Sequence, residues 1–351
     1  MYRGKVLIVD DSVVFRSQVK EALTGVEGLE TASASSGKLA LRRLEAENFD
    51  LVTLDLEMPE MNGFDVLAEI RKSGRPCKVI VFSSHTEGGA QAVLEALRRG
   101  ASDFVAKPVL LNQSEGPAQA IRNQLLPRVL QFLDKDNSVR HNSPQPQTRR
   151  EWVKVKLGEF VPSIVVIGSS TGGPSALEVV FRKLPRQISV PILVVQHMPP
   201  VFTATLAKRL SEISGLDVRE ANHRENLLGG RVYIAPGGYH LRLETNERGP
   251  FLTLDQRPEQ NGVRPCVDFL FESAARICGP HTLGIVLTGM GEDGKAGAIA
   301  IKNQNGAVLI QDKESCVVYG MPGAIERTGA FDRQLPLEEI SQTLSKLLEA
   351  T

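Results

Sequence analysis

The chain has 351 residues, which is long for one hydrophobic core and predicts about two domains. Its hydrophobic fraction of 42% is ordinary for a globular protein, and 41 Lys plus Arg residues balance 41 Asp plus Glu residues. The net charge of zero argues against nucleic-acid binding, because proteins that bind nucleic acid usually carry a basic excess.

The cysteines, the histidines and the apolar runs argue against further classes of protein and of site. The four cysteines form no C-x-x-C pair, which favours reduced thiols in a cytoplasmic protein. The six histidines form neither an H-E-x-x-H motif nor a Cys/His cluster, so no zinc site is expected. No run approaches the roughly 18 apolar residues of a membrane span, and the first residues show no signal peptide. We therefore expect a cytoplasmic protein that does not insert into a membrane.

The first half has the pattern of a doubly wound α/β sheet, in which apolar runs alternate with amphipathic stretches. The predicted buried strands are KVLIVD, FDLVTLDL, KVIVFSS and DFVAKP, with a weaker candidate near LETAS. Predicted helices include SVVFRSQVKEAL and GGAQAVLEALRRG, the latter ending at Gly100 as a C-cap.

Polar residues stand at the expected strand ends of this half: Asp10, Asp11, Asp55, Ser83 and Lys107. Because chemistry in open α/β sheets gathers at the carboxyl ends of strands, we expect these side chains to lie together. Clustered carboxylates repel one another, and Mg²⁺ would neutralise them. A carboxylate beside Mg²⁺, a lysine and a hydroxyl group is suited to accepting a phosphoryl group. Taken singly, the first two aspartates also fit helix N-caps, and the third fits a turn.

This set, together with the stretch MPEMNG after Asp55 and the pair Lys107–Pro108, resembles a two-component receiver domain over roughly residues 3–130. The resemblance implies a flavodoxin-like fold, Asp55 as the phospho-acceptor and a histidine kinase as the phosphodonor. It implies Mg²⁺ bound by Asp11, Asp55 and the Glu57 carbonyl. The remaining implied roles are support of the metal site by Asp10 and contacts to the phosphoryl group from Ser83 and Lys107.

The stretch DKDNSVRHNSPQPQTRR, at 134–150, is polar, contains prolines and predicts a linker. We place the first domain at 1–130, the linker at 131–156 and the second domain at 157–351. The second half repeats the α/β pattern with SIVVIGSS, PILVVQH, LGIVLTGM and GAVLIQ. It predicts a larger, Rossmann-like and mostly parallel sheet. The stretches YIAPGGYHLRLET and FLTLDQ, at 231–256, alternate and predict an antiparallel hairpin.

The stretch GSSTGGP follows the first strand of the second half. It lacks the lysine of a Walker phosphate loop and the G-x-G-x-x-G spacing of a dinucleotide site. The pattern G-x-S-x-G, from Gly168 through Ser170 to Gly172, fits a sharp turn that presents a serine above a strand end, with Pro174 opening a helix. An ordinary helix cap is the alternative.

Two more strand ends supply partners for this serine. ILVVQ runs into His197, and GIVLTGM runs into a loop that contains Asp293. Hydroxyl, imidazole and carboxylate groups at one sheet edge predict a Ser–His–Asp triad, in which His197 is the base and Asp293 fixes its tautomer. Ser169 and Glu292 are the neighbouring alternatives. Ser170 is favoured because it is the central residue of the G-x-S-x-G pattern. Asp293 is favoured because it stands in a G-x-D-G turn.

The other histidines are weaker candidates. We expect His240 to be structural, and His223 and His281 lie in loop-like segments. The two that remain are His141 in the linker and His85 in the first half.

The stretches GSSTGG, QHMP, APGGYH, RPCVD and TGMGEDG resemble the chemotaxis protein-glutamate methylesterase family. The family implies hydrolysis of γ-glutamyl methyl esters on chemoreceptor cytoplasmic domains and, often, deamidation of glutamines there. Its catalytic residues fall by motif on Ser170, His197 and Asp293. Ser169 departs from the pattern, which has a small apolar residue there. No metal or other cofactor is expected in this half.

The predicted reaction also needs donors for the oxyanion, and the backbone amides of Thr171 and Met290 are the candidates. A receiver ahead of the catalytic half predicts control by phosphorylation of Asp55, through a shift in inhibitory docking. A non-catalytic adaptor and a serine peptidase are the rival functions.

Overall fold

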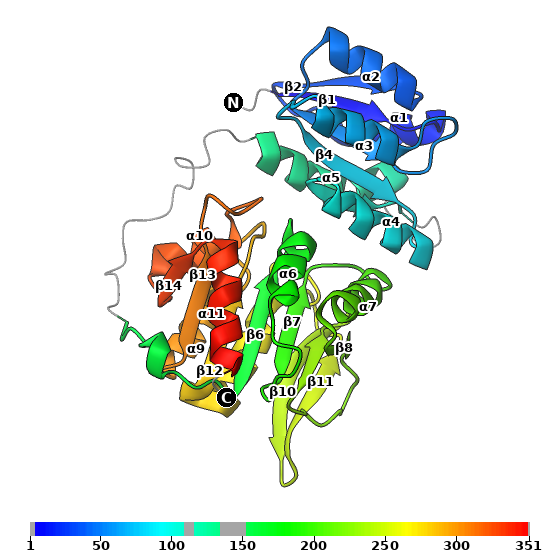
Figure 1. The fold of residues 1–351 in the computed structure, drawn as a ribbon. Helices are drawn as coiled ribbons and strands as arrows, with labels where there is room; N and C mark the ends of the chain where they lie inside the picture. Colours follow the sequence, from blue (N-terminus) through cyan, green and yellow to red (C-terminus); the bar gives the residue numbers. More distant parts are fainter. Residues whose placement is uncertain (1–3, 109–115, 134–151, 350–351) are drawn as a thin grey trace. The chain divides into compact units, whose positions relative to one another are not determined.

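The computed structural model describes residues 4–108, 116–133 and 152–349. The chain divides into two compact units, Met1–Pro144 and Gln145–Thr351, each built around its own parallel sheet (Figure 1). The predicted linker at 134–150 lies outside the described residues, and the domain boundaries stay predictions. In the described ranges, no helix is both long enough and apolar enough to cross a membrane.

The N-terminal unit has a five-stranded parallel sheet in the order β2-β1-β3-β4-β5. Its strands are β1 (Gly4–Val9), β2 (Leu29–Ala34), β3 (Leu51–Asp55), β4 (Lys78–Ser83) and β5 (Asp103–Ala106). Its helices are α1 (Val13–Leu23), α2 (Gly37–Ala46), α3 (Gly63–Lys72), α4 (Glu87–Arg98) and α5 (Pro117–Leu133). The predicted strands are confirmed, including the weak one near LETAS.

Helix ends in this unit decide one local alternative and correct one local prediction. The N-cap of α1 is Ser12, whose hydroxyl accepts a hydrogen bond from the amide of Phe15, so neither Asp10 nor Asp11 caps this helix. The C-cap of α4 is Arg99, one residue before the predicted Gly100. Gly100 takes a φ of 101° just beyond the cap, where glycine turns the chain at little steric cost.

The C-terminal unit has a seven-stranded parallel sheet in the order β14-β13-β12-β6-β7-β9-β8, and a separate antiparallel pair β10-β11. The sheet strands are β6 (Ile164–Ser169), β7 (Ile192–Gln196), β8 (Asp217–Glu220), β9 (Arg231–Ile234), β12 (Thr282–Val286), β13 (Ala307–Gln311) and β14 (Arg333–Leu335). The pair consists of β10 (His240–Asn246) and β11 (Gly249–Asp255).

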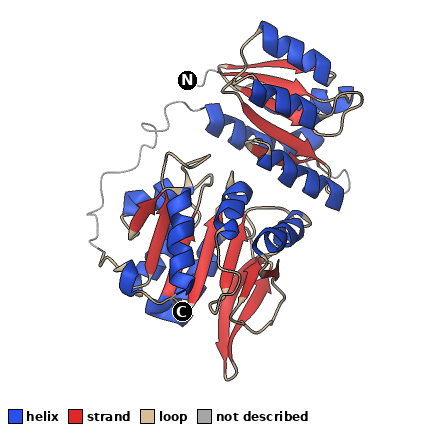
Figure 2. Ribbon diagram, viewed as in Figure 1, coloured by secondary structure: helices blue, strands red, loops and turns tan. Residues whose placement is uncertain are grey.

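Helices flank the strands in both units (Figure 2). Those of the C-terminal unit are α6 (Gly173–Arg182), α7 (Phe202–Ser214), α8 (Val267–Cys278), α9 (Lys295–Asn303), α10 (Met321–Thr328) and α11 (Leu337–Glu349). Short 3₁₀ turns occur at η1 (Leu157–Glu159) and η2 (Gly279–His281). The fold class, two doubly wound parallel sheets plus an antiparallel hairpin, is as predicted.

The hairpin is shorter than the alternating pattern at 231–256 suggests. Its first part forms β9, which lies in the parallel sheet between β7 and β8. Val232, Tyr233 and Ile234 are completely buried there, as central strands of parallel sheets require. A turn with Gly238 at a φ of 81° separates β9 from the true hairpin. The edge strands β8 and β14 escape prediction because they are short and polar.

Each sheet has a point at which the chain reverses its direction of winding. In the C-terminal sheet, β6 lies between β7 and β12, and the chain proceeds outward from β6 to β7 but from β12 to β13 on the other side. In the N-terminal sheet the same reversal occurs between β1 and β3. Ligand sites of such folds form beyond the carboxyl ends of the strands at this point.

Candidate functional site

The structure brings the predicted carboxylates of the N-terminal unit together. Carboxylate oxygens of Asp10, Asp11 and Asp55 all lie within 4.8 Å of one another, beyond the carboxyl ends of β1 and β3. Asp10 and Asp55 are buried, whereas Asp11 is exposed. Lys107, which follows β5, donates to Asp55 Oδ2 at 2.7 Å and to Asp10 Oδ2 at 3.2 Å. Burial and the neighbouring charge of Asp55 raise the pKa of Asp10 to about 6.

This cluster fits a hard divalent cation. Its ligand atoms are oxygens, and the single ammonium group of Lys107 offsets the crowded negative charge only in part. Glu57 is exposed and its amide donates to Asp55 Oδ1 at 3.3 Å, so its backbone lies beside the Asp55 carboxylate. The buried hydroxyl of Ser83 donates to the carbonyl of Gly89 at 3.0 Å.

The GSSTGGP stretch forms a sharp turn from β6 into α6. Gly172 has a φ of 78°, and a Cβ atom on it would lie 2.6 Å from Val317. A Cβ atom on Gly173 would lie 1.9 Å from Gln196 Oε1. Pro174 stands in the first turn of α6. Both glycines are therefore required sterically, which agrees with a tight strand-to-helix turn rather than a loose cap.

The two serines of this turn have different surroundings. Ser169 is completely buried, and its hydroxyl donates to Gln196 Oε1 at 2.7 Å. Gln196 Nε2 in turn donates to the carbonyl of Ser170 at 2.9 Å. Ser170 itself is only partly buried. The side-chain partner on β7 explains how a polar residue is accommodated at position 169, where the resemblance led us to expect a small apolar one.

His197 and Asp293 meet at the same sheet edge. His197 follows β7, and its Nε2 lies 2.8 Å from Asp293 Oδ2. Burial alone would raise the pKa of Asp293, but the hydrogen bonds from His197 and other donors outweigh it and lower the pKa to about 2. Glu292 instead points to exposed partners, Lys295 and Arg327. In the part of the chain that the structure describes, no hydrogen bond joins the Ser170 hydroxyl to His197.

The predicted oxyanion donors flank the serine turn. Thr171 is buried, and its carbonyl accepts the hydroxyl of Thr288 at 2.9 Å. Met290 follows Gly289, where an added Cβ atom would lie 2.9 Å from Ser170 Cβ. The Thr288–Met290 loop after β12 therefore packs directly against Ser170.

Both halves of the chain match models of known protein families. Residues 165–344 match the family model described as CheB methylesterase, and residues 6–115 match the response regulator receiver domain. A protein-glutamate methylesterase/protein-glutamine glutaminase of Trichodesmium erythraeum is 40% identical over 98% of this chain and 99% of its own length. The chain belongs to the CheB methylesterase family.

Other relatives support the same family assignment. A protein of Nocardioides sp. with the same name is 42% identical, over 98% of this chain and 95% of its own. The crystal structure of the Thermotoga maritima CheB methylesterase catalytic domain is 46% identical with a TM-score of 0.52. It covers 54% of this chain, and 99% of that structure is matched. The predicted combination of a receiver with a methylesterase domain is confirmed at the level of family.

Of the remaining histidines of this CheB methylesterase family member, His223, His240 and His281 contact groups outside the predicted triad, and the buried Nδ1 of His240 has no hydrogen-bond partner among the described residues. His240 is buried, with its Nε2 3.2 Å from the carbonyl of Pro258 and its ring packed edge-on against Phe269. His223 accepts the amide of Leu254, and His281 Nδ1 lies 3.1 Å from the carbonyl of Val161. His141 lies outside the described residues, and His85 belongs to the N-terminal unit.

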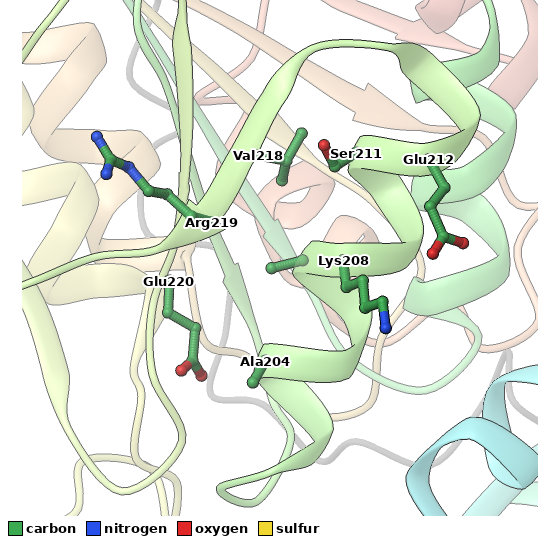
Figure 3. Close-up of a pocket in the computed structure, with 8 residues that line it drawn as sticks. Ala204, Lys208, Ser211, Glu212, Val218, Arg219 and Glu220 are labelled. Atoms are coloured by element: carbon green, nitrogen blue, oxygen red, sulfur yellow. The ribbon is translucent and has the colours of Figure 1, made fainter. Parts of the chain in front are cut away.

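Gln196 and Cys266 contact the predicted site, but sequence reasoning gave them no role. Each stands in a motif stretch, QHMP or RPCVD, which was the available signal. A pocket of about 530 Å³ between α7 and β8 contains none of the predicted site residues (Figure 3). Its polar lining comes mainly from Lys208, Glu212, Arg219 and Glu220.

Proposed function

We propose that this chain hydrolyses γ-glutamyl methyl esters on the cytoplasmic domains of chemoreceptors, using Ser170, His197 and Asp293. The observation that carries this proposal is the 2.8 Å contact between His197 and Asp293 at the sheet edge where the G-x-S-x-G turn emerges. The family supports the substrate class, because full-length relatives are named protein-glutamate methylesterase/protein-glutamine glutaminase.

The two nitrogens of His197 have separate tasks in this proposal. Because the lowered pKa of Asp293 keeps it a carboxylate, Nε2 of His197 is the donor in their hydrogen bond. Nδ1 is then the nitrogen that accepts the proton of Ser170. The 2.8 Å contact of His197 with Asp293 supports these roles, which are those of a serine-hydrolase triad; the Ser170 hydroxyl would bond to Nδ1 as the reaction begins.

The reaction follows from these roles. Ser170 Oγ attacks the ester carbonyl while His197 takes its proton, and the amides of Thr171 and Met290 bind the oxyanion. The bond to the methoxy group breaks as His197 returns the proton, so methanol leaves and a glutamyl ester of Ser170 remains. A water molecule deprotonated by His197 then hydrolyses that ester, which restores Ser170 and leaves glutamate. A glutamine side chain would react by the same route and release ammonia.

The N-terminal unit regulates this activity through phosphorylation of Asp55 by a histidine kinase. The groups that would hold Mg²⁺ are the carboxylates of Asp11 and Asp55 and the carbonyl of Glu57, and Asp10 supports them. Bound there, Mg²⁺ offsets charge on the transferred phosphoryl group. Lys107 already contacts Asp55 and would pair with the phosphoryl oxygens. Ser83 would reach them only after its hydroxyl leaves the Gly89 carbonyl.

The test is release of labelled methanol from methyl-labelled receptor membranes by the full-length chain, in parallel with its Ser170→Ala variant. Release by the wild type and none by the variant would support the proposal. No release by either protein, together with binding to receptor, would favour an adaptor. Cleavage of unmethylated receptor peptides would favour a peptidase.

A further inference from the structure

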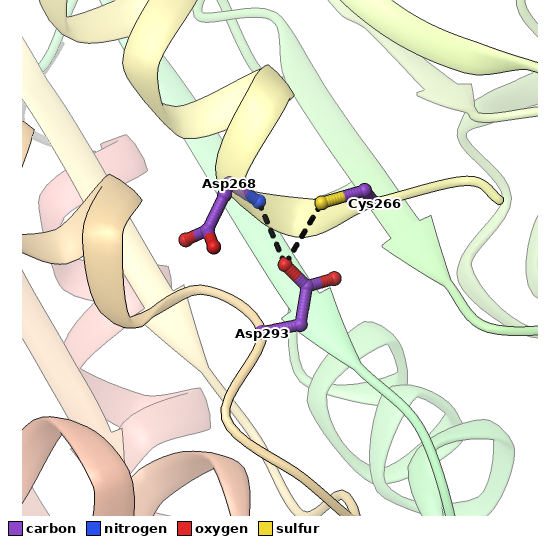
Figure 4. Close-up of side chains that lie close together, drawn as sticks. All are labelled: Cys266, Asp268 and Asp293. Carbon is purple, nitrogen blue, oxygen red and sulfur yellow. Dashed lines mark hydrogen bonds between the residues drawn. The ribbon is translucent and has the colours of Figure 1, made fainter. Parts of the chain in front are cut away.

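The N-terminus of α8 surrounds the carboxylate of Asp293 with hydrogen-bond donors (Figure 4). Oδ1 accepts the thiol of Cys266 at 3.0 Å and the amide of Asp268 at 3.1 Å. Oδ2 accepts the amide of Val267 at 2.7 Å on the side where it also meets His197. The amide of Gly294 adds a further bond to Oδ1 at 3.0 Å. The orientation of the carboxylate is therefore determined from α8 as well as by its own loop.

These donors make the surroundings of Asp293 suitable for an anion. Cys266, Asp268 and Asp293 are close enough together to suggest a metal cluster. However, the amides of a helix N-terminus favour negative charge and disfavour a cation. Both oxygens of Asp293 also already accept several bonds, and the Asp268 carboxylate accepts the amide of Gly297 at 2.8 Å instead. The cluster is thus better explained as a support for Asp293.

Cys266 has the surroundings of a hydrogen-bond donor rather than of a nucleophile. Its side chain is completely buried. Burial and the neighbouring charge of Asp293 raise the pKa of its thiol, so the sulfur keeps its proton. A protonated thiol 3.0 Å from a carboxylate oxygen donates to it.

We propose that Cys266 is a positioning residue, whose thiol acts with the first amides of α8 to hold Asp293 oriented toward His197. The inference rests on the proposed function, because it assumes that the His197–Asp293 pair assists the reaction. With the thiol bonded to Oδ1, rotation of the carboxylate is restricted and Oδ2 stays directed at His197. Removal of the thiol leaves the amide donors in place, so the effect is a loss of alignment and not a loss of the pair.

The first measurement is the rate of methanol release by full-length variants at several substrate concentrations. Cys266→Ala should lower kcat on the order of tenfold with little change in KM, because a donor to a charged group is lost away from the substrate surface. Cys266→Ser supplies a hydroxyl donor and should recover kcat to within about twofold of wild type. Should Cys266→Ala fail to fold, Cys266→Val takes its place as an apolar variant without a donor.

Cys278→Ala is the matched control, because Cys278 ends the same helix α8 at its opposite end. It should leave kcat unchanged. A second control introduces Cys266→Ala into the Asp293→Asn variant. There it should lower kcat by less than about a further twofold, because the effects of residues that act through one another do not add. A merely structural role would multiply the two losses instead.

Wild-type kcat for Cys266→Ala, or failure of Cys266→Ser to recover activity, would overturn the inference. It would also be overturned if the double variant lost kcat by the product of the two single losses. Ser170→Ala, measured alongside, separates this from failure of the proposed function. If Ser170→Ala is inactive while Cys266→Ala is fully active, only the positioning role is wrong. If Ser170→Ala remains active, the triad itself is wrong.

Discussion

Two adjacent serines, Ser169 and Ser170, differ in what their hydroxyl groups can do. The hydroxyl of Ser169 is buried and bonded to Gln196, whereas Ser170 is partly exposed on the turn. A nucleophile must reach the substrate, and a hydroxyl committed to a buried acceptor cannot do so without breaking that bond. At the scale of single residues, burial thus separates two candidates that sequence spacing alone separates only weakly.

Ser170→Ala should reduce methanol release by several orders of magnitude, because members of a triad act as a unit and losses near 10⁶-fold are known. His197→Ala should have a similar effect, and Asp293→Asn a milder one. Ser169→Ala is the matched control. It should retain most activity while lowering the free energy of unfolding by about 1–3 kcal/mol, since Gln196 loses a buried partner. An active Ser170→Ala and an inactive Ser169→Ala would reverse the assignment.

Asp55→Asn should abolish phosphorylation by a small-molecule phosphodonor, because it removes the acceptor carboxylate. Incorporation into the wild type should require Mg²⁺, and Asp11→Ala should raise the Mg²⁺ concentration needed, because it removes a charged oxygen ligand. Asp65→Asn, an exposed aspartate in the first turn of α3, is a control that should behave as wild type. Stable labelling of Asp55→Asn at the wild-type level would contradict the assignment.

Strand ends and the helices that follow them bring the functional groups together. β6, β7 and β12 lie side by side, so the residues after each of them reach one edge of the sheet. Away from that edge, α9 is tied to the loop before β14 by a buried ion pair between Lys302 and Asp332, at 2.6 Å. Both side chains are 1% exposed, so neither charge has water as a substitute partner.

Lys302→Met should lower the free energy of unfolding by about 3–5 kcal/mol, because it leaves the charge of Asp332 buried without its partner. Lys183→Met, which removes the partner of Glu338 in an exposed pair, should cost only about 0–1 kcal/mol. Denaturant unfolding of the C-terminal transition measures both. Equal losses of unfolding free energy in the two variants would show that burial of the Lys302 pair does not affect stability.

At the scale of the whole molecule, the two units have separate sheets and separate cores. The first described residues of the C-terminal unit are bound to it. Trp152 Nε1 donates to the carbonyl of Thr328 at 3.4 Å, and the amide of Val155 donates to Asp332 at 2.7 Å. A chain that begins at about residue 151 therefore keeps these contacts.

Such a truncated chain should fold alone and release methanol faster than the unphosphorylated full-length chain. A tethered inhibitory domain acts at an effective concentration of order millimolar, so even weak inhibition is maintained. Phosphorylation of Asp55 should close much of the difference between the two rates. Initial rates of the truncated, unphosphorylated and phosphorylated proteins test this. A truncated chain no faster than the unphosphorylated one would exclude inhibition by the receiver and favour recruitment of the receptor or direct activation.

The fold class, the family and the polar groups at the strand ends could all be predicted from residue patterns. Apolar runs and turn motifs are local patterns, and they report local conformation and burial. Three contacts could not be predicted in this way: the pairing of Val232–Ile234 within the parallel sheet, the bond of Ser169 to Gln196 and the contact of Cys266 with Asp293. Each of those contacts joins segments that are distant in sequence, and their pairing depends on the path of the chain through the whole sheet. Residue spacing along the chain does not specify that path.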